Sequence, residues 1–167
     1  MSYAKISDAQ TQQSVSTQFT LPSISMLSLS DNSTLRLSFQ TPTLAGAALG
    51  TSTNNTKWLN FTSAVPPSVT RKISAQITSG SIPSGVRLVI ETSAAVSGAG
   101  TLGSPITTIY PNSTSQTIIS GIGGAYTGVG TANGYKLTFS LDIQDYSQLK
   151  GSASSSSVTV TYTIADN

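Results

Sequence analysis

Apolar and polar residues alternate along most of the chain, and this period-two pattern predicts β-strands. The clearest examples are residues 135–143, YKLTFSLDI, and residues 157–164, SVTVTYTI. Successive side chains of a strand point to opposite faces, so each segment has one apolar face and one face rich in hydroxyl groups. A helical pattern is confined to one expected turn at 145–150. The chain is therefore predicted to be all-β.

Eight further segments have a strand pattern, and clusters of Pro, Gly, Asn and Ser separate them. They are residues 13–21, 23–30, 33–40, 57–64, 71–79, 85–92, 106–110 and 115–121. Strands with one solvated face, joined by short turns, predict an antiparallel two-sheet sandwich, Ig-like or jelly-roll, of about nine or ten strands. The 167 residues suffice for one domain. We expect a polar tail at 1–13 and a single sandwich domain at 14–167.

The first predicted strand, at the start of QSVSTQFTLPSISMLSLS (13–30), has an apolar side formed by Val15, Phe19 and Leu21, with Thr17 between them. Pro22 cannot donate a hydrogen bond to a sheet and divides the run into two strands. The first strand has three options: it pairs within its own sandwich, it stays unpaired and exposes an aggregation-prone apolar edge, or it completes the sheet of a neighbouring molecule. Head-to-tail donation produces a fibre, so we predict a donor strand at 14–21 and a homo-oligomer or homopolymer.

The composition favours an extracellular or cell-surface protein. Only 8% of the residues are charged, and Ser and Thr make up about a third of the chain, so hydroxyl groups solvate the surface. No apolar run approaches the roughly 20 residues of a membrane-spanning helix, and no transmembrane segment is expected. Residues 1–10, MSYAKISDAQ, lack the apolar core of a signal peptide, so we expect the sequence to begin after its cleavage.

The residue types argue against catalysis and against nucleic-acid binding. The chain has no His and no Cys, and therefore lacks the commonest bases, metal ligands and nucleophiles. Asp142 and Asp145 are close in sequence, but a polar strand face followed by a helix cap explains them better than a hydrolase pair. The net charge is only +2, and Arg71-Lys72 is the sole adjacent basic pair. We predict a non-enzymatic protein without cofactor, metal or nucleic-acid partner.

Three aromatic residues, Trp58, Tyr110 and Tyr126, are candidates for binding a ligand such as a glycan. Tyr126 lies in the glycine-rich stretch at 121–134, which either turns a long loop or leaves room around an exposed ring. Trp58 lies within a predicted strand, where packing in the core competes with ligand stacking. These residues support an alternative function, a carbohydrate-binding or adhesive sandwich module.

The segments SVSTQFTL (14–21) and VTVTYTIADN (158–167) resemble the first and last strands of bacterial pilin and surface-adhesin domains of the chaperone–usher type. The region from WLNFTSAV (58–65) to GYKLTFSLDIQDYS (134–147) is similar to small secreted β proteins of Bacteroidetes-like bacteria. The resemblance implies that Val15, Phe19 and Leu21, with Thr17 between them, are the residues a donor strand inserts. It further implies a structural role in self-assembly or adhesion.

Overall fold

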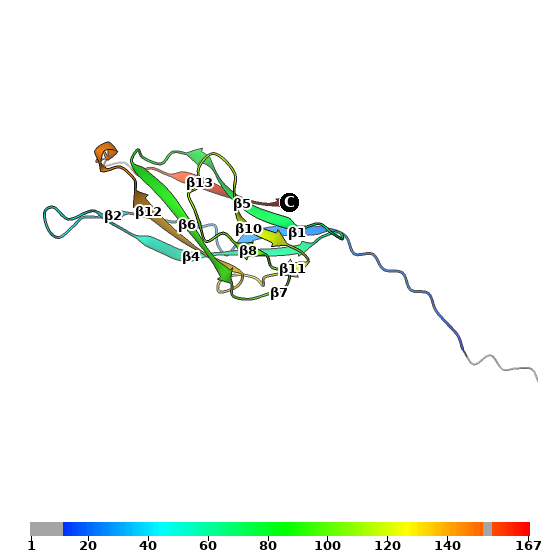
Figure 1. Cartoon of the computed structure of the whole chain (residues 1–167). Coiled ribbons are helices and arrows are strands. Elements are labelled where there is room, and N and C mark those ends of the chain that lie inside the picture. Colours follow the sequence, from blue (N-terminus) through cyan, green and yellow to red (C-terminus); the bar gives the residue numbers. More distant parts are fainter. Residues whose placement is uncertain (1–11, 152–154) are drawn as a thin grey trace, which may run out of the picture.

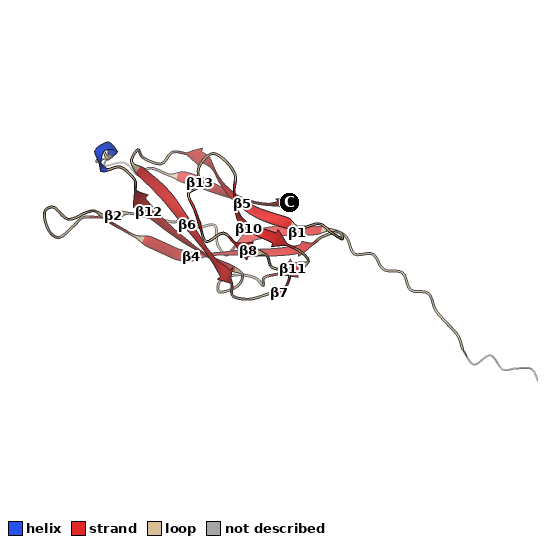
Figure 2. Ribbon diagram, viewed as in Figure 1, coloured by secondary structure: helices blue, strands red, loops and turns tan. Residues whose placement is uncertain are grey.

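The chain forms two antiparallel β-sheets that face each other in an open sandwich (Figure 1). A computed structural model describes residues 12–151 and 155–167. Strands account for nearly all the regular structure of these residues, and one short helical turn follows β12 (Figure 2). The predicted all-β, antiparallel two-sheet fold is confirmed.

The described residues form thirteen strands. They are β1 (Ile24–Leu29), β2 (Phe39–Gln40), β3 (Gly50–Thr51), β4 (Thr53–Ala64), β5 (Arg71–Gly80), β6 (Val86–Ala95), β7 (Ala99–Gly100), β8 (Ser104–Pro105), β9 (Thr108–Ile109), β10 (Gln116–Ile122), β11 (Ala125–Tyr126), β12 (Tyr135–Ile143) and β13 (Val158–Asp166). The number exceeds the predicted nine or ten because several of them are bridges of only two residues.

The larger sheet has the order β7-β11-β4-β12-β6-β9, and β1 pairs with β4 in addition. The smaller sheet has the order β13-β5-β10-β8, while β2 and β3 form a separate two-stranded ribbon. Within the described residues, β1 pairs only with β4, and β13 pairs only with β5. These two strands therefore each present an unpaired edge.

The core fills the space between the two sheets with apolar residues of both, mostly from alternate strand positions. The larger sheet contributes Leu59, Phe61, Leu88, Ile90, Tyr135, Leu137 and Phe139, and the smaller sheet contributes Ile73, Ala75, Ile118, Ile119 and Ile122. Phe61 and Tyr135 stack with their ring centroids 6.1 Å apart. The buried Tyr135 hydroxyl donates to the carbonyl oxygens of Leu102 and Gly103, at 2.8 and 3.1 Å, so its burial leaves no polar group unpaired.

Three of the predicted strands differ from the structure in whole or in part. Residues 13–21 form no strand within their own chain, so the option that they pair within their own sandwich is wrong. Of the predicted strand at 106–110, only Thr108–Ile109 forms a strand, β9. Residues 33–38 form no strand, and only Phe39–Gln40 of the predicted strand at 33–40 forms β2. Leu35 and Leu37 nevertheless pack against the core, so the alternation predicts their burial correctly without predicting strand pairing.

The expected helical turn at 145–150 is a 3-10 turn at Tyr146–Gln148. Asp145 caps it, because its side chain accepts a hydrogen bond from the Ser147 amide at 2.9 Å. Hydrogen bonds from the Ser147 side chain, the Ser147 amide and the Gln148 side chain lower the pKa of Asp145 below its ordinary value. The predicted polar tail at 1–13 lies outside the described residues except for Gln12 and Gln13.

Candidate functional site

The segment before β1 projects away from the sandwich as an extended chain (Figure 1). Its three apolar side chains are almost fully solvent-exposed: Val15 is 89% exposed, Phe19 88% and Leu21 81%. Thr17 between them is exposed as well. The predicted donor residues therefore contribute nothing to the core of their own molecule, and their apolar surface is free for another one.

A buried guanidinium fixes the point where this segment leaves the body. Arg71, on β5, is only 5% exposed. It donates to the Ile24 carbonyl oxygen, to Ser23 Oγ at 2.8 Å and to the Asp166 carboxylate at 2.8 Å. One side chain thus joins the start of β1 to the end of β13, and the projecting segment begins at Pro22.

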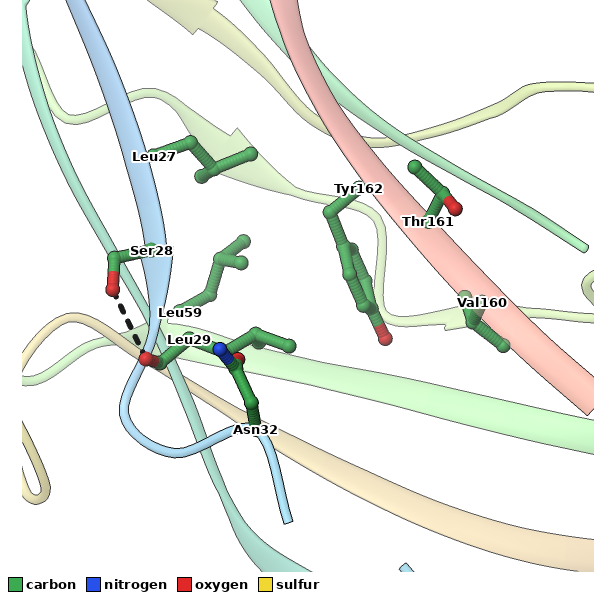
Figure 3. Close-up of a pocket in the computed structure, with 8 residues that line it drawn as sticks. All are labelled: Leu27, Ser28, Leu29, Asn32, Leu59, Val160, Thr161 and Tyr162. Carbon is green, nitrogen blue, oxygen red and sulfur yellow. Dashed lines mark hydrogen bonds between the residues drawn. The ribbon is translucent and has the colours of Figure 1, made fainter. Parts of the chain in front are cut away.

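A groove of about 410 Å³ opens between β1 and β13, the two edge strands on this side of the sandwich (Figure 3). Its lining consists of Leu27, Ser28, Leu29, Asn32, Leu59, Val160, Thr161 and Tyr162. Four of these residues are aliphatic, and each of the flanking strands has an unpaired edge within the described chain. The groove therefore combines aliphatic and polar side chains, and it lies beside two strands whose free backbone groups are those that an added strand pairs with.

A second buried cation holds the other end of β1. Lys57, on β4, is 5% exposed, and its ammonium forms an ion pair with Asp31. It also donates to the Ser33 carbonyl oxygen at 2.8 Å and to Ser33 Oγ at 2.9 Å. The hydrogen bond from Lys57 is the main cause that lowers the pKa of Asp31 to about 2. With Arg71 at one end and Lys57 at the other, β1 is fixed in place beside the groove.

The groove contains a hydroxyl group without a partner. The ring of Tyr162 descends from β13 into the groove (Figure 3), and its Oη is buried with no hydrogen bond within the described residues. Burial raises the pKa of the Tyr162 hydroxyl, so it stays protonated at any physiological pH. The only other buried side-chain polar atom without a partner in the described part of the chain is Thr92 Oγ1, on β6.

The three aromatic candidates do not form one site, although two of them share a sheet face. Trp58 is half-buried beside Lys136, outside the core, so packing in the core, one of the two roles considered for it, is wrong. The reason is strand parity, since Leu59 takes the inward position. Tyr126, 57% exposed, pairs in register with Thr62 of the same strand as Trp58 and lies on the same outer face.

Tyr110 is separate from this pair. The Arg87 guanidinium lies 3.9 Å from the centre of the Tyr110 ring and covers one of its faces. Arg87 also forms an ion pair with Asp142 at 2.6 Å. The two aspartates considered for catalysis are thus engaged by structure, Asp142 by Arg87 and Asp145 by the helical turn.

Other kinds of site find little support in residues 12–151 and 155–167. In these residues no cluster of three or more acidic side chains is arranged to hold a metal ion. In the same part of the chain, no helix has the length and apolar character needed to span a membrane. Comparison of the chain with protein-family models, curated proteins and solved structures finds no significant match. The likeness to pilin domains therefore stays a prediction.

Proposed function

We propose that this protein is an extracellular, non-enzymatic structural subunit that assembles head to tail, each copy donating residues 14–21 to the groove between β1 and β13 of the next. The observation that carries the proposal is that one molecule has both halves of such a joint. Val15, Phe19 and Leu21 project into solvent, and a groove of mixed aliphatic and polar lining lies beside two unpaired strand edges. Because donor and acceptor are different surfaces, repetition of the contact builds an open fibre.

The donor segment and the edge strand β13 agree in length. The eight residues of an extended segment 14–21 span about 27 Å, and the nine residues of β13 span about 30 Å, of which residues 160–162 line the groove. An inserted strand buries its inward side chains. Complete removal of a Val, Leu or Phe side chain from water contributes about 1.5–3 kcal/mol. Backbone hydrogen bonds to the free edges add strength and align the strand.

The attachment of the segment favours donation to another molecule. Arg71 holds Ser23 and Ile24, and proline restricts the backbone at Pro22. To fill its own groove, the chain has to reverse direction within the few residues beside Pro22. It leaves the body in an outward direction instead (Figure 1).

The experiment compares the full chain with a variant in which Val15, Phe19 and Leu21 are all replaced by Ser. Size-exclusion chromatography with light scattering and negative-stain electron microscopy measure assembly. We expect fibres from the full chain and monomers from the variant, with equal thermal unfolding, because these side chains do not contact the folded body. A matched variant with Ser16, Gln18 and Thr20 replaced by Ala changes the other side of the donor and should still assemble. A monomeric full chain, or fibres from the Ser variant, would refute the proposal.

A second candidate function, glycan binding, rests on the shared outer face of Trp58 and Tyr126. Exposed rings on a sheet face are suited to stacking against sugars. A glycan array separates this function from assembly: Trp58→Ala and Tyr126→Ala would abolish glycan signals while leaving fibres intact. An array without signal for the native chain would exclude this candidate.

A further inference from the structure

We infer that the hydroxyl of Thr17 in the donated strand pairs with the hydroxyl of Tyr162 in the receiving subunit, and that this pair sets the register of the joint. The inference rests on the proposed function and deepens it, since it states which donor residue lies opposite which residue of the receiving strand. Tyr162 has a buried hydroxyl without a partner in the described chain, and Thr17 is the one hydroxyl residue in the apolar row of the donor segment.

The acceptor side has one unmet polar group. The groove around Tyr162 is lined by Leu27, Leu29, Leu59 and Val160, and also by the polar residues Ser28, Asn32 and Thr161. None of these residues is hydrogen-bonded to the Tyr162 hydroxyl, which is buried without a partner in the described chain. A buried hydroxyl is costly to leave unpaired, so an incoming strand is held best where it supplies a partner.

The donor side has one polar residue in its apolar row. Val15, Phe19 and Leu21 alternate with Ser16, Gln18 and Thr20, and Thr17 is the sole hydroxyl residue at an inward position. A slip of one residue turns every inward side chain outward. A slip of two residues places Val15 or Phe19 against the Tyr162 hydroxyl and moves Thr17 away from it. One polar position in an apolar row is a known way to specify register.

The Thr17–Tyr162 pair also determines how the two strands match along their length. The inward residues of β13 are half-buried and alternate with exposed threonines. In antiparallel order, the pairs are Val15 with Ile164, Thr17 with Tyr162, Phe19 with Val160, and Leu21 with Val158. In parallel order with the same Thr17–Tyr162 pair, Leu21 instead meets the ion-paired Asp166. Of the two arrangements that contain this pair, only the antiparallel one gives every apolar donor residue an apolar partner.

A double-mutant cycle on the full chain tests the hydroxyl pair. Thr17→Val, Tyr162→Phe and the double variant are compared by critical concentration for assembly, measured by sedimentation. We expect Thr17→Val to raise the critical concentration about 10-fold, because it removes the hydrogen bond that the buried Tyr162 hydroxyl gains on assembly. The double variant should match Thr17→Val to within about 3-fold and not add a second loss, since the pair is already absent in either single variant. Thr20→Val, on the outer side of the donor, should have no effect. Thr17 lies outside the folded body, so Thr17→Val tests assembly without changing the stability of the groove.

Disulfide mapping tests the register directly, and the absence of cysteine from the native chain makes it unambiguous. Val15→Cys combined with Ile164→Cys should crosslink fibres into covalent chains on non-reducing gels. Val15→Cys combined with Val160→Cys, which a parallel strand would bring together, should not. Additive effects in the cycle, or crosslinking of the second pair instead of the first, would overturn the register while leaving strand donation intact. A native chain that never assembles would refute strand donation itself.

Discussion

Replacement of Phe19 by Ala tests how strongly the donor strand is held. Phe19 is 88% exposed in the single chain, so its replacement should not change the stability of the folded body. In the proposed joint, the ring leaves water and lies opposite Val160 of the receiving subunit. Full burial of a Phe side chain contributes about 1.5–3 kcal/mol, and the methyl group of Ala keeps a small part of it. We take the loss as about 2 kcal/mol, which weakens each joint about 30-fold.

Sedimentation of the polymer measures this change directly, because the critical concentration of an open-ended fibre equals the dissociation constant for adding one subunit. We expect Phe19→Ala to raise the critical concentration about 30-fold, by the relation between free energy and affinity. The midpoint of urea unfolding, measured on monomers below the critical concentration, should stay at the native value. Gln18→Ala, the neighbour on the outer side of the donor, serves as control. An unchanged critical concentration for Phe19→Ala, or an equal rise for Gln18→Ala, would show that residue 19 does not enter a groove.

The remaining predictions concern the body that carries the groove. Asp31→Asn should reduce stability to urea at pH 7 but not at pH 2: the pKa of Asp31 is lowered to about 2 in the folded chain by Lys57, so its contribution is present above about pH 4 and is lost as the pH falls towards 2. An equal effect at both pH values would contradict the ion pair. Arg71→Ala should lower the free energy of unfolding by about 2–3 kcal/mol in urea titrations, because it removes charged hydrogen bonds from both edge strands; a loss within measurement error would show that the clamp is dispensable. Gly134→Ala should cost about 2 kcal/mol or more in the same assay, since φ is +71° and the added Cβ would lie 2.3 Å from the Leu59 carbonyl oxygen. Its control, Gly130→Ala, has φ +82° but open space around it, and should cost only about 1 kcal/mol.

The fold was predictable because period-two alternation reports burial on one face of a strand. Residues 135–143 and 71–79 show this well: Tyr135, Leu137 and Phe139 are buried, as are Ile73 and Ala75. The alternation does not show which strands pair with each other. Leu35 and Leu37 alternate correctly and pack on the core, yet no neighbouring strand bonds to their backbone.

Parity also accounts for the residues of the site that the sequence analysis missed. Lys57 is two positions before the inward Leu59, and Arg71 is two positions before the inward Ile73. The same parity that places these apolar residues in the core predicts that both cations point inward. Trp58 has the opposite parity and lies outside. Identifying the ion-pair partners was beyond the sequence, because Asp31 and Asp166 reach these cations only through tertiary packing.

The opening segment shows where an alternating pattern is ambiguous in principle. Residues 14–21 have the side-chain alternation of a half-buried strand, but nothing in that alternation says which molecule supplies the other half. In the single chain Val15, Phe19 and Leu21 face solvent, and β1 and β13 have free edges beside a groove that is partly aliphatic. Exposed apolar strands and open sheet edges are each prone to non-specific association. A joint that covers the segment of one subunit with the groove of the next removes both exposures at once. Because it also gives the Tyr162 hydroxyl a partner, such a joint favours one defined register over random association.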